Sequence, residues 1–204
     1  MIEDLFLKRK QIRHYKQDTY PDENLMESLF EKAFKLVPSK QSLMPYKVHV
    51  LGPDQGEVKD RIYHLSTDQD IDVPIFINHQ LKAPYVLIFT QRLAEPSPQV
   101  AEDIKNGHLF YSCDPEFYTT RVPEALVEMG MFCTVLTGLA MEQDIDVSYT
   151  MCLERSSKKY QDAGLRFIDE EVCMGMSLGY EVENKYVKSE KEFKPNMDKV
   201  ILWN

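Results

Sequence analysis

The sequence predicts one globular domain, or two small ones, built from both α-helices and β-strands. The chain has 204 residues, of which 43% are apolar. That is enough to remove about 70% of the unfolded surface from water. Two segments carry helical signals, and three short segments show the alternation or the continuous apolar runs of strands. We expect residues 1–204 to form a single domain without a disulfide scaffold.

The first long helix is expected between Pro21 and Pro38. Proline is tolerated in the first turn of a helix, and Asp22 and Glu23 suit its positive end. A second proline then ends the helix. Apolar residues recur at helical spacing between the two prolines and predict one apolar face; they are Leu25, Leu29, Phe30, Ala33, Phe34 and Val37.

Three segments are expected to be strands. Residues 46–51 (YKVHVL) alternate and end at Gly52 and Pro53, after which Asp54 can cap a helix that reaches about Leu65. Residues 83–90 (APYVLIFT) are typical of a central strand. Residues 171–180 (EVCMGMSLGY) alternate bulky with small side chains, so the bare face can admit another backbone or a flat ligand.

Between the second and third expected strands, the sequence predicts first an irregular segment and then a long helix. Residues 91–121 are rich in polar residues and prolines and predict an irregular excursion, with a short helix near residues 99–106. Pro123 and Glu124 then begin a helix that reaches about Gln143. Since no charged residue occurs between Met129 and Met141, we expect this helix to be buried on all sides, in the core or at a subunit interface.

Composition narrows the function classes. The net charge of −9 argues against a nucleic-acid partner. No run of twenty apolar residues occurs, which argues against a membrane span, and the first ten residues lack the apolar run of a signal peptide. The four cysteines are widely spaced, so a reduced, cytoplasmic location is expected. The five histidines lack metal-ligand spacing, and the sequence shows no catalytic triad and no metal site.

One segment contrasts with the acidic remainder of the chain. Residues 8–16 (KRKQIRHYK) contain five lysines or arginines and no acid. Arg9 and Arg13 are four residues apart, so their planar guanidinium groups could converge on one phosphate or carboxylate. The alternative is a solvated helix end, where cations interact favourably with the helix dipole.

The order of these segments resembles the nitroreductase family of FMN-dependent oxidoreductases over nearly the whole chain. The family's first motif, RRSxR, looks like residues 9–13, with Gln11 in place of the serine. Its second motif has a Pro-Ser pair followed by Asn, Gln and Pro-Trp. That motif resembles residues 38–46, with Ser42 and Met44 at the Asn and Gln positions.

Two further segments carry the resemblance. The family's C-terminal phosphate grip looks like residues 191–195, where Lys191 matches, Phe193 replaces an arginine and Lys194 is a neighbouring cation. Residues 144–152 resemble the stretch whose backbone follows one edge of the flavin ring. Asp144 stands there at a position where the family usually has glycine.

The resemblance implies an α+β fold with a mixed, mainly antiparallel central sheet flanked by helices. It also implies a homodimer with FMN between the subunits. Phosphate contacts would come from Arg9, Arg13 and Lys191, with Lys10 nearer the ring and Gln11 on the ribityl hydroxyls. The implied cofactor-binding residues are Arg9, Lys10, Gln11, Arg13, Pro38, Ser39, Ser42, Met44, Ser148, Tyr149, Thr150, Lys191 and Lys194.

The resemblance further implies an activity. NADH or NADPH would pass hydride to FMN, which would reduce a nitroaromatic, a quinone or a similar flat acceptor, and no side-chain acid or base is required. Met44, Asp144 and Phe193 motivate a second hypothesis, a dimer of the same fold that has lost redox activity and acts as a binding or structural protein. A third hypothesis is a flavin enzyme of another branch, such as a dehalogenase or a flavin-consuming enzyme. The excursion's aromatic residues would cover an acceptor or form a local core or dimer arm; they are Phe110, Tyr111, Phe117 and Tyr118.

Overall fold

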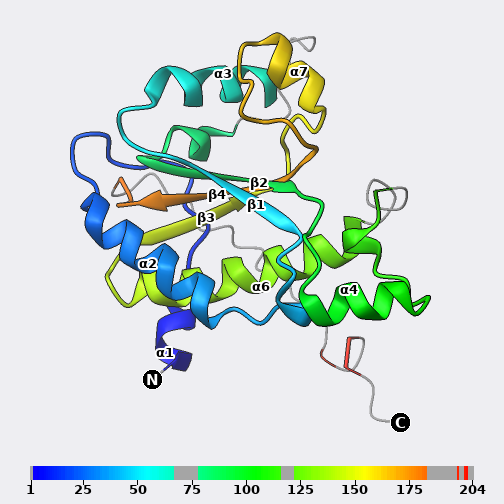
Figure 1. Ribbon diagram of the computed structural model, residues 1–204. Helices are drawn as coiled ribbons and strands as arrows, with labels where there is room; N and C mark the ends of the chain where they lie inside the picture. Colours follow the sequence, from blue (N-terminus) through cyan, green and yellow to red (C-terminus); the bar gives the residue numbers. More distant parts are fainter. Residues whose placement is uncertain (1, 67–77, 116–121, 183–196, 198–199, 202–204) are drawn as a thin grey trace.

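Helices cover both faces of a four-stranded sheet in the computed structural model (Figure 1). The structure describes residues 2–66, 78–115, 122–182, 197 and 200–201. The strand order is β1-β2-β4-β3, and every neighbouring pair is antiparallel. The parallel pairing of a mixed sheet is therefore not found in the described part of the chain. The strands are β1 (Tyr46–Leu51), β2 (Tyr85–Gln91), β3 (Asp146–Thr150) and β4 (Val172–Gly179).

The helices form two layers. Helices α2 and α6 cover one face of the sheet, and α3 and α7 cover the other (Figure 1). The described helices are α1 (Ile2–Leu7), α2 (Glu23–Leu36), α3 (Gly56–Ser66), α4 (Pro98–Lys105), α6 (Val122–Met141) and α7 (Ser157–Asp162). Short 3-10 helices connect them: η1 (Lys40–Ser42), η2 (His79–Lys82) and η3 (Tyr111–Cys113).

Strand β2 lies between two hydrophobic cores, and all of its residues are buried. Leu87 and Phe89 pack with α2 and α6, whereas Val86 and Ile88 pack with α3 and α7. A strand that is covered on both faces has no reason to alternate polar with apolar residues. This confirms the prediction of a central strand from the continuous apolar run.

Most of the expected elements occur at the expected places. The Asp22 side chain accepts a hydrogen bond from the Asn24 N–H and caps α2, as the Pro-Asp-Glu start predicts. Strand β1 has the predicted bounds, and α4 falls within one residue of the expected short helix. Helix α3 begins at Gly56, so Gln55 precedes it rather than the predicted cap Asp54.

The charge-free helix α6 is only partly buried in the protomer. By length and composition alone it could cross a membrane, but it packs against α2 and all four strands as a core helix. Val127, Gly130, Met131 and Thr134 nevertheless lie exposed in one row along it, which we call the α6 stripe. The expected burial in the core is therefore met on one face of α6, and burial of the α6 stripe at a subunit interface, the other alternative, stays a prediction.

The bare face of β4 is filled by other side chains of this chain. A Cβ added at Gly179 would lie 2.9 Å from the Pro84 Cδ and 3.0 Å from the Tyr15 Cδ1. The Tyr15 hydroxyl donates to the Ser148 Oγ at 2.8 Å and to the Ser177 carbonyl at 3.2 Å. At this end of β4 the bare face is therefore occupied by the side chains of Tyr15 and Pro84, and not by the predicted backbone or flat ligand.

Replacement of Gly179 by alanine is expected to lower the free energy of unfolding by about 1 to 3 kcal/mol, because the methyl group overpacks this contact. Denaturant unfolding measures the change. Gly56→Ala is the matched control, since a Cβ there meets nothing within 4 Å and the position, at the start of α3, lies away from α6. Equal stability of Gly179→Ala and the parent chain would contradict the contact.

Lys59 is a buried lysine held by backbone carbonyls. It is 5% exposed, and its Nζ donates to the carbonyl oxygens of Ala83 and Pro84, each at 2.9 Å. Burial lowers the pKa of the Lys59 ammonium from its ordinary value of 10.5 to about 8. Between these pH values the unfolded chain binds a proton that the folded chain has released.

Stability is therefore expected to rise with pH between about 8 and 10.5 through Lys59, since the unfolded state binds more protons there. Below pH 8 the cost of burying the charge is fully present. The measurement is the free energy of unfolding at several pH values for the parent chain and for Lys59→Met. The free energy of unfolding of the parent chain minus that of Lys59→Met cancels the other titrating groups, and it should increase from pH 8 to pH 10.5. If it does not change with pH, the lowered pKa is refuted.

Candidate functional site

The basic segment lies beside β3, with its apolar residues buried and its two arginines exposed. Ile12 is 1% exposed and anchors the segment in the core below α3 and α7. The Arg9 guanidinium carbon lies 6.0 Å from the centre of the Tyr149 ring. Among the described residues Arg13 makes no ion pair, whereas the Lys10 Nζ lies 3.0 Å from the Glu181 Oε2. In the described part of the chain, no carboxylate is paired with Arg9 or Arg13.

Gln11 joins the basic segment to β3 through both ends of its amide. Its Nε2 donates to the Tyr149 carbonyl at 2.6 Å, and its Oε1 accepts from the Tyr149 N–H at 3.3 Å. The Tyr149 hydroxyl in turn contacts Thr137 of α6 in a short hydrogen bond. Burial raises the pKa of Tyr149, which keeps this hydroxyl protonated. In this conformation the Gln11 amide is fully used within the protein.

The predicted residues of β3 turn their hydroxyl groups inward. Ser148 accepts from Tyr15, and the Thr150 Oγ1 donates to the Asn78 Oδ1 at 3.1 Å. Asn78, which is 3% exposed, also donates to the Cys152 carbonyl. A ligand at this edge of the sheet would therefore meet the Tyr149 ring and the Gln11 side chain rather than these hydroxyls, because Gln11 already bonds both backbone groups of Tyr149.

The second predicted motif, residues 38–44, lies at the other half of α6. Gln41, Ser42 and Met44 all have positive φ angles, of 54°, 58° and 45°. The Ser39 Oγ accepts from the Met44 N–H at 2.9 Å, and Arg92 donates to the carbonyls of Leu43 and Met44. One hydrogen bond within the loop and two from Arg92 outside it therefore hold its left-handed backbone in place.

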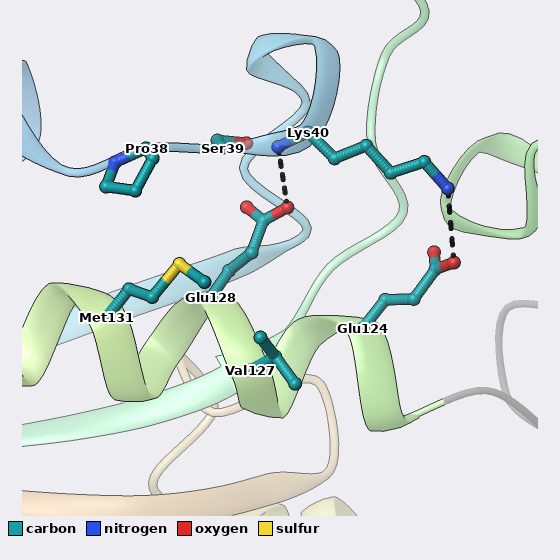
Figure 2. Close-up of a pocket in the computed structure, with 7 residues that line it drawn as sticks. All are labelled: Pro38, Ser39, Lys40, Glu124, Val127, Glu128 and Met131. Carbon is teal, nitrogen blue, oxygen red and sulfur yellow. Dashed lines mark hydrogen bonds and ion pairs between the residues drawn. The ribbon is translucent and has the colours of Figure 1, made fainter. Parts of the chain in front are cut away.

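A cavity of about 460 Å³ lies between this loop and the first half of α6. Figure 2 shows Glu128 and Glu124 pointing from α6 toward Lys40. The Glu128 Oε1 accepts the Lys40 backbone N–H at 3.0 Å, and the Glu124 Oε1 lies 3.5 Å from the Lys40 Nζ. The cavity is lined by Pro38, Ser39, Lys40, Glu124, Val127, Glu128 and Met131.

The structure thus divides the predicted site into two groups. The first joins Arg9, Gln11 and Tyr149 near Thr137, and the second joins Pro38 and Ser39 to residues 124–131. Val127 and Thr137 are ten residues apart on α6, which corresponds to about 15 Å along the helix axis. Val127, Gly130 and Met131 of the α6 stripe belong to the second group, and Thr134 lies between that group and Thr137.

Some sequence predictions fall outside the described residues. They are the phosphate contacts of Lys191 and Lys194, the substitution at Phe193, and the aromatic residues Phe117 and Tyr118. The described part of the excursion is tied to the rest of the fold. The Ser112 Oγ donates to the Glu124 Oε2 at 2.9 Å, and the Ala94 N–H donates to the Ser112 carbonyl at 2.7 Å.

Two residues of the site were missed from the sequence. Glu128 is the only acid among residues 125–141, and it stands three residues after Ala125 and four before Phe132, which are both buried. That helical spacing was a usable signal that its side chain points inward. Asn78 follows the apolar residues 73–77 (VPIFI) in the sequence and has no comparable signal.

Comparison with solved structures identifies the fold of this layered α+β protein. The chain is similar to a putative nitroreductase from Exiguobacterium sibiricum 255-15 in complex with FMN, at 17% identity and a TM-score of 0.68. The match covers 100% of this chain and 97% of that one. The chain therefore has the nitroreductase fold, as the order of its motifs predicted.

Two further solved structures are similar in fold over nearly the whole chain. Putative nitroreductase ydfN from Bacillus subtilis gives a TM-score of 0.71 at 12% identity, with 99% of this chain and 98% of that one covered. NfnB, an FMN- and NADPH-dependent nitroreductase from Sphigopyxis sp. strain HMH, gives 0.66 at 17% identity, with 100% and 98% covered. No protein-family model matches the sequence, and no curated protein matches it.

The left-handed position at Asp144 agrees with the motif that carried the resemblance. Asp144 has φ +55° in the turn that leads from α6 into β3. Glycine adopts this conformation without steric cost, and aspartate is one of the few other residues that tolerate it. The replacement of the family's usual glycine is therefore compatible with an unchanged turn.

Proposed function

We propose that this chain is an FMN-dependent NAD(P)H oxidoreductase that acts as a cytoplasmic homodimer and reduces flat acceptors such as nitroaromatics or quinones. The observation that carries the proposal is the full-length similarity to a protein solved with FMN, combined with two exposed arginines at the matching motif. NfnB, of the same fold, is FMN- and NADPH-dependent. NADH and NADPH are both candidates as the electron donor here.

The residues beside β3 fit the phosphate and the ring of FMN. Arg9 and Arg13 would hold the phosphate in charge-assisted hydrogen bonds, because neither is neutralised by a described carboxylate. Lys191 and Lys194 are proposed to complete this grip. The backbone of residues 148–150 and the Tyr149 ring would lie along the flavin, and bound FMN would supply the hydride chemistry.

A homodimer would unite the two groups of the site. The α6 stripe presents apolar Val127 and Met131 together with small Gly130 and Thr134. A two-fold axis across this stripe would place the Pro38–Ser39 group of one protomer opposite the Arg9–Arg13 group of its partner. Pro38, Ser39, Ser42 and Met44 would then contribute to a site on the other subunit.

One observation favours the second hypothesis, a dimer without redox activity. The Gln11 amide is bonded to both backbone groups of Tyr149, so it offers no free donor to the ribityl hydroxyls in this conformation. Met44, which stands at a Gln position of the motif, offers no useful hydrogen bond either. FMN would then depend mainly on the phosphate grip.

The visible spectrum of the purified protein separates the two hypotheses. A yellow protein, or one that takes up added FMN, is expected, followed by bleaching of the flavin with NADH or NADPH in the absence of oxygen. A colourless protein that does not take up FMN would refute the enzyme. FMN uptake without bleaching by either nucleotide would favour the dimer without redox activity.

A further inference from the structure

The cavity between residues 38–40 and α6 contains a buried hydrogen-bond acceptor that has no donor among the described residues. Glu128 is 7% exposed, and its Oε1 accepts the Lys40 N–H. Its Oε2 has no hydrogen-bond partner among the described residues. Figure 2 shows this second oxygen on the side of Pro38 and Met131, away from Lys40. A buried carboxylate oxygen without a donor is costly, so a donor from a ligand would be bound with little competition.

The charge of Glu128 is not cancelled by its surroundings. The Lys40 ammonium reaches Glu124 instead, at 3.5 Å. The Tyr46 hydroxyl donates to the Met44 sulfur, and the pKa of Tyr46 is raised to about 12 by burial and then by the charge of Glu128. The cavity lining therefore carries two carboxylates and one ammonium, and it disfavours an anion.

The lining also contains three apolar residues and one serine. The apolar residues are Pro38, Val127 and Met131, and the volume of about 460 Å³ is typical of a site for a small molecule. Proline and valine give rigid walls, and the methionine thioether adapts to an aromatic face. Such walls suit a planar ring system, and a hydrogen bond to the Glu128 Oε2 would fix the orientation of the ring.

We propose that this cavity binds a flat aromatic molecule that carries a ring N–H, an amino or an amidinium donor, which is held by the Glu128 Oε2. This inference rests on the proposed function, because it names the class of electron acceptor that the oxidoreductase would reduce. That class is aromatics with an amino group or a positive charge, and not anionic aromatics. A nitroaromatic carboxylate would be a poor ligand, whereas an aminated heteroaromatic would be a good one.

The test is calorimetric titration of the full-length protein, with and without saturating FMN, using proflavine as the cationic diamino probe and acridine-9-carboxylate as the anionic probe. Proflavine is expected to bind about tenfold or more tightly than the anionic probe. Glu128→Gln keeps the shape but turns the free oxygen into a donor, so it should remove this preference. Glu142→Gln, the same charge change at an exposed position of the chain just after α6, should not.

A second variant guards against loss of folding in Glu128→Gln. The Lys40 side chain is 63% exposed and lies outside the α6 stripe, so Lys40→Met should fold and remove the ammonium from the lining, which should strengthen proflavine binding about threefold. Equal affinity for both probes, or proflavine binding unchanged in both variants, would overturn the inference. If the protein takes up FMN but binds both probes equally, this inference is wrong and the proposed function stands. If the protein prefers proflavine but takes up no FMN, the cavity is a binding site, and only its assignment to an electron acceptor is wrong.

Discussion

Replacement of Arg13 by alanine is expected to weaken FMN binding by about 1.5 to 3 kcal/mol, or about 10- to 150-fold in Kd. Arg13 is exposed and makes no ion pair with any described residue, so its removal would take away the proposed phosphate contact without breaking an ion pair in the described part of the chain. Fluorescence titration of FMN, which is quenched on binding, measures the change. The free energy of unfolding without FMN should stay within about 0.5 kcal/mol of the parent value.

The matched control for Arg13→Ala is Arg166→Ala. Arg166 is an exposed arginine that follows α7, outside both groups of the site, and its replacement changes the net charge by the same amount. It should leave the FMN affinity within about twofold, since an exposed charge at a distance is screened by salt. If Arg13→Ala binds FMN as tightly as the Arg166 control does, the phosphate role of Arg13 is wrong.

Replacement of Gly130 by glutamate is expected to convert the proposed homodimer into monomers. Gly130 lies in the α6 stripe, and a Cβ there meets nothing within 4 Å in the protomer. Glutamate is a better helix former than glycine by about 0.5 to 1 kcal/mol, so the protomer should not lose stability. A two-fold interface would instead bury two unpaired carboxylates, at a cost of about 3 to 5 kcal/mol each.

Sedimentation equilibrium measures the association constant of Gly130→Glu. Leu36→Glu is its control, because Leu36 is 63% exposed at the end of α2 and lies outside the α6 stripe. The control should associate like the parent chain. A Gly130→Glu protein that remains dimeric would remove the α6 stripe from the interface. Weakened FMN binding in the monomer would in addition support a site shared between protomers.

The elements that depend on local pattern were predictable from the sequence. The bounds of β1 follow from its alternation and from the break at Gly52 and Pro53, and α2 follows from its proline start and apolar spacing. The exposed row on α6 was not predictable in this way. Val127 and Met131 are as apolar as the buried residues beside them, so composition does not distinguish a core face from a face available to a partner.

The site was predictable as a set of motifs but not as a geometry. The basic segment and the Pro-Ser pair were recognised, yet no local pattern says that they lie at different halves of α6. The bond between Gln11 and Tyr149 joins residues 138 positions apart. Such a contact depends on the tertiary fold, since a glutamine in an exposed segment is by itself expected to meet water. Glu128, by contrast, could have been found from its position among buried helix neighbours.

The Gln11 amide also has a consequence for the colloidal behaviour of the protein. Strand β3 is at the edge of the described sheet, where outward N–H and C=O groups can pair with a strand from another molecule and so promote aggregation. At Tyr149 both of these groups are already bonded to Gln11. A strand from another molecule could therefore pair with β3 at Tyr149 only by displacing the Gln11 amide.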